Sequence, residues 1–517
     1  MSRSFNTAGP CVQGDHYMLD PLARLDVDEV LRLIDDKRYF VLHAPRQTGK
    51  TTSLIALMQR LNREGRYRAL YANIEAAQAA RGDVAMGIGA VVQAIARQCR
   101  DLTGDASLLA WVDTHRADSP GDLLSGLLSH WSQLDPAHPT VLLLDEVDAL
   151  VGDTLISLLR QIRAGYAQRP GAFPQSLVLC GVRDVRDYRI HTASQEIITG
   201  GSAFNIKAES LRLGNLSREE TVALWMQHQI ETGQTFDPAI WPELWEDTRG
   251  QPWLVNALGY ECTLERYKAA RERLIQSRAT HLDQLTDKLR EPRVRQVVSD
   301  ILSSENVEGR YPTDDLQYVE DLGLVRTRPM VEISNRIYRE VIPRELTWTT
   351  QSVITHDQAW YLTADRHLNM PKLLAAFQQF FREHSDAWAK GFDYHEAAPQ
   401  LLMQAFLQRI VNGGGRISRE YGLGWKRTDL FLEWPLDEAQ GFSGPVQRVV
   451  IELKLVKKAP ETAERQGLEQ TVGYARQVGA DEAHLVLFDR RPEMPWDERI
   501  WQRDAVQEGV RVMVWGA

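Results

Sequence analysis

The sequence predicts a multidomain protein of the α/β class, and three observations support this fold class. The chain has 517 residues, which at about 100 to 200 residues per domain allows two to four domains. Residues 38–52 read as a short apolar strand, a turn with proline and glycine, and the start of a helix. Residues 423–455 read as two further strands joined by a loop. We therefore expect a parallel-sheet domain, helical modules and a second α/β domain.

The composition is that of an ordinary globular chain. Hydrophobic residues make up 43% and charged residues 25%, which excludes a disordered, collagen-like or coiled-coil protein. Lysine and arginine total 60 against 70 aspartates and glutamates, so the formal charge is −10. This charge excludes a protein that is basic over its whole surface. Any contact with nucleic acid must therefore use a local basic surface or bound metal ions.

Cysteine spacing and hydropathy indicate where the protein resides. No CxxC spacing occurs among the cysteines, so neither a disulfide framework nor a structural zinc site is predicted: Cys11, Cys99, Cys180 and Cys262. No run approaches the roughly 18 apolar residues that span a bilayer, and the first residues lack the apolar core of a signal peptide. We expect a cytoplasmic protein that is neither exported nor embedded in a membrane.

The turn after the first predicted strand carries a phosphate-binding motif. It matches GxxxxGK[ST], except that Ala44 replaces the first glycine. In such a loop backbone N–H groups point at phosphate oxygens, and Gly49 allows close approach. Lys50 would meet the β/γ-phosphates, and the Thr51 hydroxyl would ligate Mg²⁺. The expected ATP-binding residues are Ala44, Pro45, Arg46, Gln47, Thr48, Gly49, Lys50, Thr51 and Thr52.

A second apolar run, residues 140–145, ends in adjacent acids. This pattern is typical of a buried parallel strand that delivers carboxylates to the C-terminal edge of a sheet. Asp145 would hold Mg²⁺, directly or through water, and Glu146 would polarise the attacking water. Asp148 is either a third acid of the site or the cap of the following helix.

A third apolar run, residues 176–181, precedes Arg183. Where such a strand lies beside the phosphate loop it carries a polar sensor to the γ-phosphate, and Arg183 is the candidate; the alternative is an ion pair with Asp184 or Asp187. The segment between the runs has helical spacing and carries three arginines: Arg160, Arg163 and Arg169. One alternative is that one of them acts in trans as an arginine finger. We favour the other interpretation, in which they lie on a solvated helix face.

Residues 17–350 resemble a bacterial and archaeal group of AAA-like, or STAND-like, P-loop ATPases. The strings that carry the resemblance are YFVLHAPRQTGKTT, VLLLDEVDAL, VLCGVRDVRDY and GSAFNIKAESLRLGNLSREE. The resemblance implies an ATPase core at residues 1–208 and a helical lid at 209–288. In the lid, residues 250–255 resemble the family's glycine-proline motif, with a helix-initiating turn as the alternative. Members often form rings, so a homo-oligomer is one expected arrangement.

Residues 289–350 are predicted to form a winged helix. Such a module either binds DNA through a recognition helix or packs against the ATPase as a regulatory arm. Four acids here would repel phosphate, and they favour the regulatory arm: Asp314, Asp315, Glu320 and Asp321.

Residues 356–517 form the second predicted α/β domain, which carries a second chemical constellation. Because strand side chains alternate with period 2, Glu452 and Lys454 project to one face. If the two strands pair as a hairpin, Asp429 joins Glu452 around a divalent ion. Two carboxylates that hold Mg²⁺ and an ammonium that orients its bound water suit phosphodiester hydrolysis. A cross-strand ion pair is the alternative.

This domain resembles the PD-(D/E)XK superfamily, which has a restriction-endonuclease-like fold. The resemblance implies catalysis by Asp429, Glu452 and Lys454 with Mg²⁺, or with Mn²⁺ as the alternative ion, although Thr428 replaces the motif's proline. Gln470 and Tyr474 match the QxxxY helix of RecB-like members, so the resemblance implies that they belong to the catalytic site as well. The alternative for Gln470 and Tyr474 is that they are packing residues of a helix. Glu396 is either an extra metal ligand or a helix N-terminal acid.

Together these motifs predict an ATP-binding and ATP-hydrolysing protein whose nucleotide state regulates a Mg²⁺-dependent nuclease. DNA is the nucleic acid that we expect as the partner, and the resemblances point to genome defence or mobile-element biology. The alternative is a nucleotide-gated regulator or DNA-binding protein whose nuclease-like domain does not cut. A third interpretation keeps the nuclease and makes ATP a structural ligand.

Overall fold

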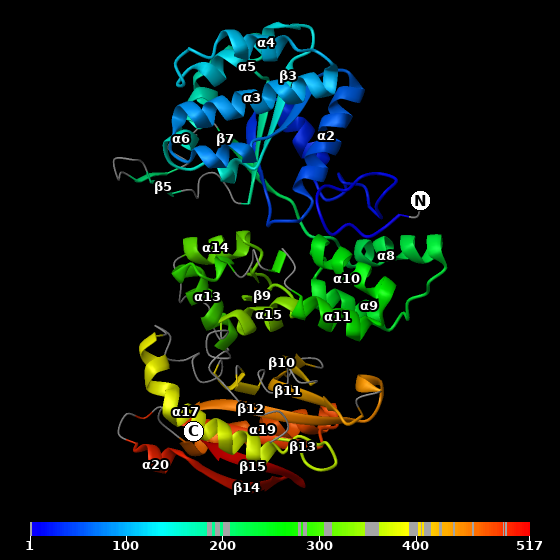
Figure 1. Cartoon of the computed structure of the whole chain (residues 1–517), viewed down its shortest axis with the longest axis vertical. Coiled ribbons are helices and arrows are strands. Elements are labelled where there is room, and N and C mark those ends of the chain that lie inside the picture. Colours follow the sequence, from blue (N-terminus) through cyan, green and yellow to red (C-terminus); the bar gives the residue numbers. More distant parts are fainter. Residues whose placement is uncertain are drawn as a thin grey trace. The chain divides into compact units, whose positions relative to one another are not determined.

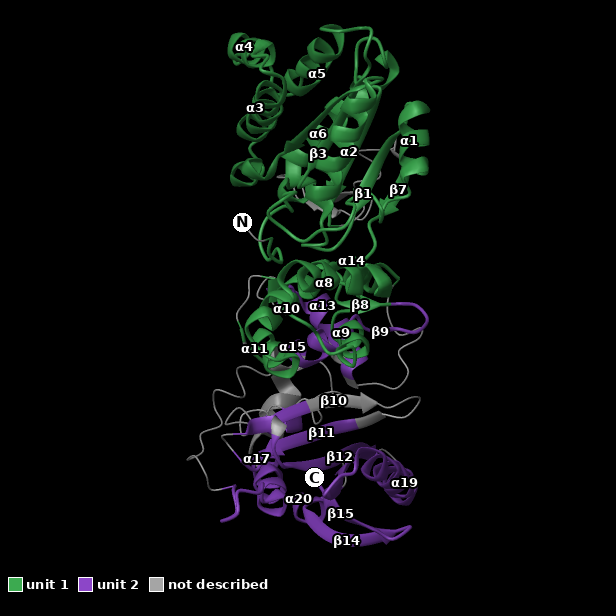
Figure 2. Ribbon diagram, turned by 90° about the vertical axis from the view of Figure 1, so that its right-hand side faces the viewer, with its two compact units in different colours: residues 1–283, 312–326 green, residues 284–311, 327–517 purple. Residues whose placement is uncertain are grey.

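The computed structural model divides the chain into two compact units. Unit 1 comprises residues 1–283 and 312–326, and unit 2 comprises residues 284–311 and 327–517 (Figure 2). The described residues are 3–182, 189–191, 197–199, 207–277, 281–282, 287–303, 313–346, 361–391, 402–404, 406–407, 415–422, 427–437, 440–456, 460–489, 491 and 494–517. Among them, no helix has both the length and the apolar character that a membrane span requires.

Unit 1 is built on a parallel five-stranded sheet, which confirms the predicted sheet of the first domain (Figure 1). The strand order is β2-β3-β4-β1-β7. The central strands β1, β3 and β4 are buried at every residue, as their uninterrupted apolar runs predict. The strand bounds are β1 Tyr39–His43, β2 Arg68–Asn73, β3 Thr140–Asp145, β4 Ser176–Gly181 and β7 Lys207–Arg212.

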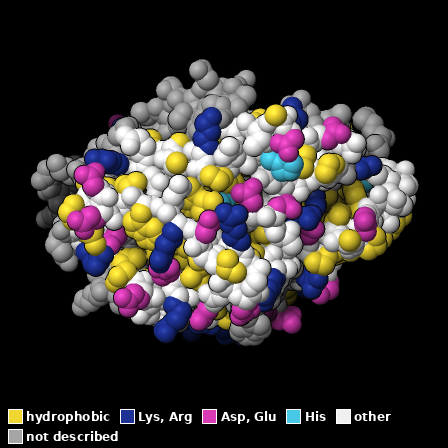
Figure 3. All heavy atoms as spheres, turned by 90° about the horizontal axis from the view of Figure 1, so that it is seen from below, with side chains coloured by type: hydrophobic (Ala, Val, Ile, Leu, Met, Phe, Trp, Pro, Cys, Tyr) yellow, Lys and Arg dark blue, Asp and Glu magenta, His cyan; other side chains and the backbone are white. Residues whose placement is uncertain are grey.

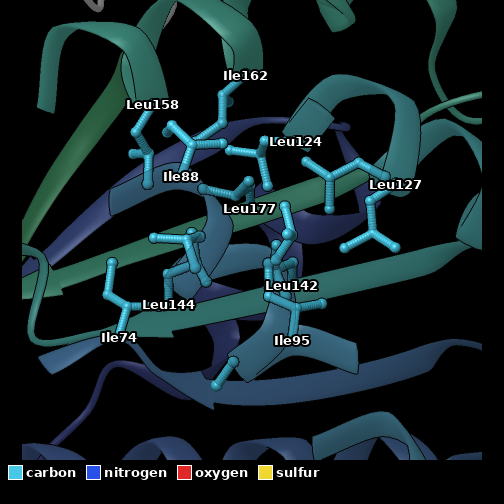
Figure 4. Packing of buried hydrophobic residues seen from close by; sticks show 14 of the residues in the cluster. Ile74, Ile88, Ile95, Leu124, Leu127, Leu142, Leu144, Leu158, Ile162 and Leu177 are labelled. Atoms are coloured by element: carbon cyan, nitrogen blue, oxygen red, sulfur yellow. The ribbon is translucent and has the colours of Figure 1, made fainter. Parts of the chain in front are cut away.

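Helices cover both faces of this sheet, and alternation along β3 decides which residue faces which layer. Leu142 and Leu144 pack with α3, α5 and α6 on one face (Figure 4), whereas Val141 and Leu143 pack with α1 and α2 on the other. Truncating Leu142 to alanine would cost about 2–5 kcal/mol of stability. The helix bounds are α1 Val27–Asp35, α2 Lys50–Glu64, α3 Val84–Thr103, α4 Ser107–Thr114, α5 Leu123–Gln133 and α6 Gly152–Ala164. A separate two-stranded sheet pairs β5 Arg189–His191 with β6 Ile197–Thr199.

Unit 1 also contains a group of helices that follows the sheet in the sequence. A capping box between Ser217 and Glu220 begins α8, and Pro252 occupies the first turn of α10 after Gln251, whose side chain caps it. These helices are α8 Arg218–Thr232, α9 Ile240–Thr248, α10 Pro252–Leu264 and α11 Tyr267–Gln276, and the later part of unit 1 contains α14 Thr313–Asp321 and β8 Val325–Arg326.

The N-terminal segment, residues 3–18, packs against these helices rather than against the sheet. Arg3 forms an ion pair with Glu231 of α8 at 2.8 Å, and the indole N–H of Trp253 in α10 donates to the carbonyl of Thr7 at 2.9 Å. The ring of Phe5 lies where a Cβ on Gly259 would have to be, so the segment and α10 approach closely. The N-terminal segment therefore forms one packed layer with α8 and α10.

Unit 2 contains a mixed six-stranded sheet of order β10-β11-β12-β13-β15-β14. Strand β13 is parallel to both β12 and β15, and the other neighbours are antiparallel. The strand bounds are β10 Arg416–Gly422, β11 Arg427–Pro435, β12 Val446–Val456, β13 Glu482–Asp489, β14 Trp501–Gln507 and β15 Val510–Gly516. The helices are α13 Pro292–Ser303, α15 Arg336–Leu346, α17 Met370–Gly391, α19 Pro460–Val478 and α20 Trp496–Arg499, and a short strand β9 covers Glu332–Ile333.

Alternation along β13 again separates two layers. Val486 and Phe488 pack with α17 in one hydrophobic cluster, and Leu485 and Leu487 pack with α19 in another. Helix α19 makes the crossover that a parallel connection from β12 to β13 requires. The sheet confirms a separate α/β region in the C-terminal half; its identity as a nuclease-like fold stays a prediction.

The domain boundaries predicted at residues 208, 288 and 350 also stay predictions. Within the module predicted as a winged helix, residues 313–326 belong to unit 1 and residues 327–346 belong to unit 2.

Candidate functional site

The phosphate-binding loop connects β1 to α2, at the C-terminal edge of the unit 1 sheet. Gly49 has φ 89° and precedes the first turn of α2; this left-handed backbone favours glycine. The Lys50 ammonium donates to the carbonyls of Ala44 and Pro45 at 3.0 Å each, and Thr48 closes the loop through a 2.8 Å bond to Pro45. Backbone N–H groups and a buried ammonium thus meet at one place, which fits an anion such as a phosphate.

Alanine at position 44 has a packing explanation. Its methyl group is fully buried in the hydrophobic cluster formed by α1, α2 and their face of the sheet. The cluster gains apolar contact there, while the loop keeps glycine at position 49.

Asp145 lies beside the loop, at the end of β3. Its side chain is fully buried, and its Oδ2 atom accepts hydrogen bonds from the Thr51 hydroxyl at 2.7 Å and the Tyr71 hydroxyl at 3.1 Å. The backbone N–H of Glu146 donates to Oδ1 at 2.9 Å. Thr51 and Asp145 are the two residues that the sequence proposes as Mg²⁺ ligands, and the structure places them in direct contact. A hydroxyl and a carboxylate are oxygen donors of the kind that Mg²⁺ prefers.

Glu146 has a strained backbone at φ 60° and ψ 41°. A non-glycine residue in this region costs about 1–3 kcal/mol, and such strain often occurs at functional positions. Burial raises the pKa of the Glu146 carboxyl; Lys50 opposes the shift, and the charge of Asp145 adds to it. A raised pKa brings a carboxylate nearer to the operating pH of a general base. The raised pKa and the position next to Lys50 therefore suit a general base beside the phosphate loop.

Asp148 ties the acidic turn to the end of β4. Its Oδ2 atom accepts a hydrogen bond from the backbone N–H of Val182, and a Cβ on Gly181 would lie only 2.7 Å from the same oxygen. Helix α6 begins at Gly152 without a side-chain cap, so the prediction that Asp148 caps it is wrong. The contact fixes the strand end that leads into Arg183. Arg183 itself lies outside the described residues, and its role stays a prediction.

The arginines considered as trans fingers differ in their surroundings. Arg169 stacks on the Tyr166 ring, with its guanidinium carbon 3.3 Å from the ring centroid, and donates to the carbonyl of Lys37, just before β1. Lys37 lies at the end of the sheet opposite the phosphate loop, so Arg169 has a packing role there. Arg160 and Arg163 are exposed on α6, as a solvated helix face requires.

An open cleft with an empty volume of about 480 Å³ adjoins the phosphate loop. The lining combines the loop and α2, the helices α8 and α10 with the turn before α8, and the chain that precedes α1: Cys11, Tyr17, Met18, Leu19, Asp20, Pro21, Arg24, Gly49, Thr52, Leu216, Leu224, Pro252 and Asn256. Mostly apolar walls next to a phosphate loop suit the base and sugar of a nucleotide.

Sequence reasoning missed three features of this site: Tyr71, Arg24 and the N-terminal segment. Tyr71 reads as one more apolar strand residue, and Arg24 lies in a loop without a motif. The Arg24 guanidinium occupies the space beside Gly49, only 2.7 Å from where a Cβ would be, and donates to the carbonyl of Gly214 at 2.9 Å. Only a tertiary fold brings these residues to the loop.

The second constellation lies on β11 and β12 of unit 2. Glu452 is 2% exposed and accepts a hydrogen bond from the Lys454 ammonium at 2.9 Å. Asp429 accepts from the backbone N–H of Leu453 at 2.8 Å, and its own N–H lies 3.4 Å from Glu452 Oε2. All three predicted core residues therefore meet at one place.

The electrostatics of this pair are unfavourable. Burial raises the pKa of Glu452, the neighbouring charge of Asp429 raises it further, and Lys454 opposes the rise, so that the pKa lies at about 8. A divalent cation would replace the proton and relieve the repulsion, so the donor set fits a metal ion. No group of three or more potential ligands occurs among the described residues. Glu396, the third candidate ligand, lies outside them.

Helix α19 covers this constellation. A Cβ on Gly467 would approach Lys454 Cγ to 3.2 Å, so the helix rests on the lysine stem. Tyr474 is buried against Phe431 and Val450, which fits the packing alternative for this residue. The Gln470 Oε1 atom is a buried acceptor without a hydrogen bond among the described residues. Helix α19, which covers the constellation, therefore carries a side-chain oxygen that remains available as a hydrogen-bond acceptor.

Surface charge in unit 2 is mixed on the face that Figure 3 shows. Basic and acidic side chains are interspersed over its described part, and Arg511 pairs with Asp504 between β15 and β14 at 2.9 Å. This face therefore offers a polyanion no broad basic surface.

Comparison with known proteins identifies the first of the two sites. Residues 33–188, which include the phosphate loop and the acids after β3, match the AAA domain family (AAA_22). This part of the chain is an AAA-type P-loop ATPase domain, which confirms the AAA-like resemblance for these residues; its extension to residues 17–350 stays a prediction. No curated protein matches the chain.

Several solved structures are similar to part of the chain. The Walker-type ATPase PABY2304 of Pyrococcus abyssi has 13% identity and a TM-score of 0.48, over 65% of this chain and 99% of that one. ORC2 of Aeropyrum pernix has 16% identity and a TM-score of 0.37, over 64% and 96%. Cdc6p from Pyrobaculum aerophilum has 16% identity and a TM-score of 0.31, over 64% and 94%.

Proposed function

We propose that this chain hydrolyses ATP with Mg²⁺ in unit 1 and that its nucleotide state controls a Mg²⁺-dependent nuclease in unit 2. The observation that carries the nuclease is the convergence of Asp429, Glu452 and Lys454, with one carboxyl pKa raised to about 8. DNA is the substrate that we would test first. When bound, Mg²⁺ would supply charge neutralisation and a water of lowered pKa at each site.

At the phosphate loop, each residue of the chain has a distinct task. The Lys50 ammonium and the loop N–H groups bind the phosphates, and Thr51 with Asp145 holds the ion. The carboxylate of Glu146 takes the proton of the attacking water, a role that its raised pKa suits. The apolar cleft between the N-terminal segment and α10 receives the nucleoside.

In unit 2, Asp429 and Glu452 hold the cation, and Lys454 orients the attacking water or stabilises the charge that develops on the phosphate. Lys454 is close enough for this role, because its ammonium already lies 2.9 Å from Glu452 Oε1. Two carboxylates that attract a cation also explain how a chain of net charge −10 could recruit a polyanion.

Helix α14 is the element that we propose for coupling the two activities. Gly323, just after α14, lies so close to Pro45 of the phosphate loop that a Cβ would come within 2.8 Å of the proline ring. Asp321 faces His43 of β1 at 3.9 Å, and Arg212 of β7 donates to the carbonyl of Glu320 at 2.9 Å. A change in the loop would therefore reach α14, and the chain continues from there into unit 2.

Two assays test the proposal. The first measures ATP turnover in wild type, Lys50→Ala and Glu146→Gln; we expect both variants to lose turnover, and unchanged turnover would leave ATP as a structural ligand. The second mixes protein with plasmid and Mg²⁺, with and without ATP. We expect cleavage by wild type and none by Asp429→Ala. Identical behaviour of these two proteins under every nucleotide condition would favour a regulator that does not cut.

A further inference from the structure

Tyr71 is the only residue of β2 whose hydroxyl reaches the acids after β3. It lies opposite Leu143 in the β2–β3 register, and both side chains face the α2 layer. Because side chains alternate along a strand, Asp145 shares the face of Leu143. Thr51 belongs to the first turn of α2, which packs on that face. Strand register thus delivers a phenol, a hydroxyl and a carboxylate to one point.

The contact at this point is specific. The Tyr71 hydroxyl donates to Asp145 Oδ2 at 3.1 Å, the oxygen that also accepts from Thr51 at 2.7 Å. Asp145 Oδ1 is held separately, by the N–H of Glu146. The Thr51 hydroxyl has one O–H and two lone pairs, so its oxygen can ligate a cation while its O–H still donates to Oδ2. Tyr71 is a second hydroxyl donor to the same oxygen, and because it is not itself a proposed ligand it can help to fix the orientation of the carboxylate throughout.

We propose that Tyr71 is a positioning residue that orients Asp145 for the divalent cation of the nucleotide site. This inference rests on the proposed Mg²⁺–ATP function of unit 1. Tyr71 itself touches neither nucleotide nor reacting atoms. Residues that hydrogen-bond a metal ligand raise metal affinity by fixing that ligand's geometry, and their loss typically lowers the affinity 10- to 100-fold.

The test uses the full chain and Mn²⁺ as a paramagnetic probe for the cation. Mn²⁺ bound in the presence of a non-hydrolysable ATP analogue is counted by electron paramagnetic resonance. We expect Tyr71→Phe to weaken Mn²⁺ binding about tenfold. Binding of the same analogue in EDTA should stay unchanged, because the phosphate loop is intact. A purely structural role would change both quantities or neither.

Tyr39→Phe is the matched control. Tyr39 is also a buried tyrosine of this sheet, but its hydroxyl donates to the carbonyl of Pro174, away from the acids. We expect its Mn²⁺ affinity to equal that of wild type. If Tyr71→Phe fails to bind the analogue in EDTA, Tyr71→Met, which also lacks a donor but packs flexibly, replaces it with the same expected loss.

The outcomes separate this inference from the function on which it rests. Wild-type Mn²⁺ affinity in the Tyr71 variant would overturn the positioning role and leave the ATPase intact. An equal loss in Tyr39→Phe would also overturn it. Absence of Mn²⁺ binding by wild type together with the analogue would overturn both the role and the proposed Mg²⁺–ATP site.

Discussion

At the end of β3, the buried carboxylate of Asp145 accepts hydrogen bonds from two hydroxyls, whereas in unit 2 the buried carboxylate of Glu452 meets a second carboxylate. Neutral donors from α2 and β2 fix the first group in place. The second is held by one ammonium, that of Lys454, and is opposed by Asp429. Both sites place a buried carboxylate on a strand of a sheet. In unit 1 hydrogen-bond donors stabilise that carboxylate, whereas in unit 2 a second carboxylate repels it.

This difference indicates how each site would take up its ion. The carboxylate of unit 1 is oriented in advance, and the nucleotide phosphates would bring part of the cation's coordination. The pair in unit 2 carries like charges that a proton or a cation must neutralise. We therefore expect metal binding in unit 2, more than in unit 1, to depend on pH.

The largest effect should come from removing an acid of unit 2. Glu452→Gln removes a proposed cation ligand, and we expect plasmid cleavage to be abolished, because the cation would supply the water of lowered pKa. The control is Glu433→Gln, a partly buried carboxylate on the neighbouring strand β11, opposite Arg448. Equal cleavage by Glu452→Gln and wild type would show that this constellation is a structural ion pair.

The corresponding change in unit 1 should separate binding from chemistry. Glu146→Gln keeps the size of the side chain and removes its basicity, so we expect ATP turnover to fall about 10²- to 10⁴-fold while nucleotide affinity is retained. Turnover is measured by phosphate release and affinity by equilibrium titration. Loss of affinity equal to the loss of turnover would assign Glu146 to binding instead.

The pH dependence of unit 2 should be measurable at low Mg²⁺. The pKa of Glu452 is raised to about 8 from its ordinary 4.5, so the folded metal-free protein keeps a proton that the unfolded chain has lost across this window. Its stability should therefore fall as pH rises from about 4.5 to about 8. Mg²⁺ must displace that proton, so cleavage at subsaturating Mg²⁺ should increase with pH, up to about tenfold per unit.

Glu452→Gln supplies the control for this window, measured through thermal unfolding because it should not cleave. Without the Glu452 carboxyl, the stability of the metal-free variant should no longer fall as pH rises from about 4.5 to about 8. An unchanged pH profile would place the titrating group elsewhere.

The smallest expected effect concerns α14. Gly323→Ala places a Cβ against Pro45 at a residue with φ +78°, so we expect α14 to shift from the phosphate loop. ATP should then alter plasmid cleavage less than in wild type, while ATP turnover changes by only a few-fold. The quantity to compare between the variant and wild type is the ratio of the cleavage rates with and without ATP.

Gly65→Ala is the matched control. Gly65 has φ +70° but no atom within 4 Å of an added Cβ, so it shares the backbone strain of about 1–2 kcal/mol without the contact. Equal loss of ATP control in both variants would assign the effect to instability. Full ATP control in Gly323→Ala would remove α14 from the account.

Local patterns explain what the sequence could predict. The strand, glycine turn and helix around Gly49 are contiguous, and the acids after β3 follow an apolar run, so both motifs can be read without a fold. The two strands predicted within residues 423–455 correspond to β11, Arg427–Pro435, and β12, Val446–Val456, for the same reason. Each depends on interactions between residues that are near in sequence.

Tyr71, Arg24 and Gly323 could not be found in this way. Tyr71 reaches Asp145 through strand register, and Gly323 reaches Pro45 only after a long helical excursion of the chain. Such contacts depend on which strands are neighbours and on how helices return to the sheet. Neither is encoded in a short motif.

The most direct test of control by nucleotide inactivates each proposed site separately and measures both activities. Plasmid cleavage and ATP turnover are measured side by side in wild type, Lys50→Ala and Asp429→Ala, with Mg²⁺ and with or without ATP. We predict an asymmetry: Asp429→Ala abolishes cleavage and retains turnover, whereas Lys50→Ala loses turnover and the response of cleavage to ATP. Cleavage by Lys50→Ala that still responds to ATP as wild type does would contradict the account.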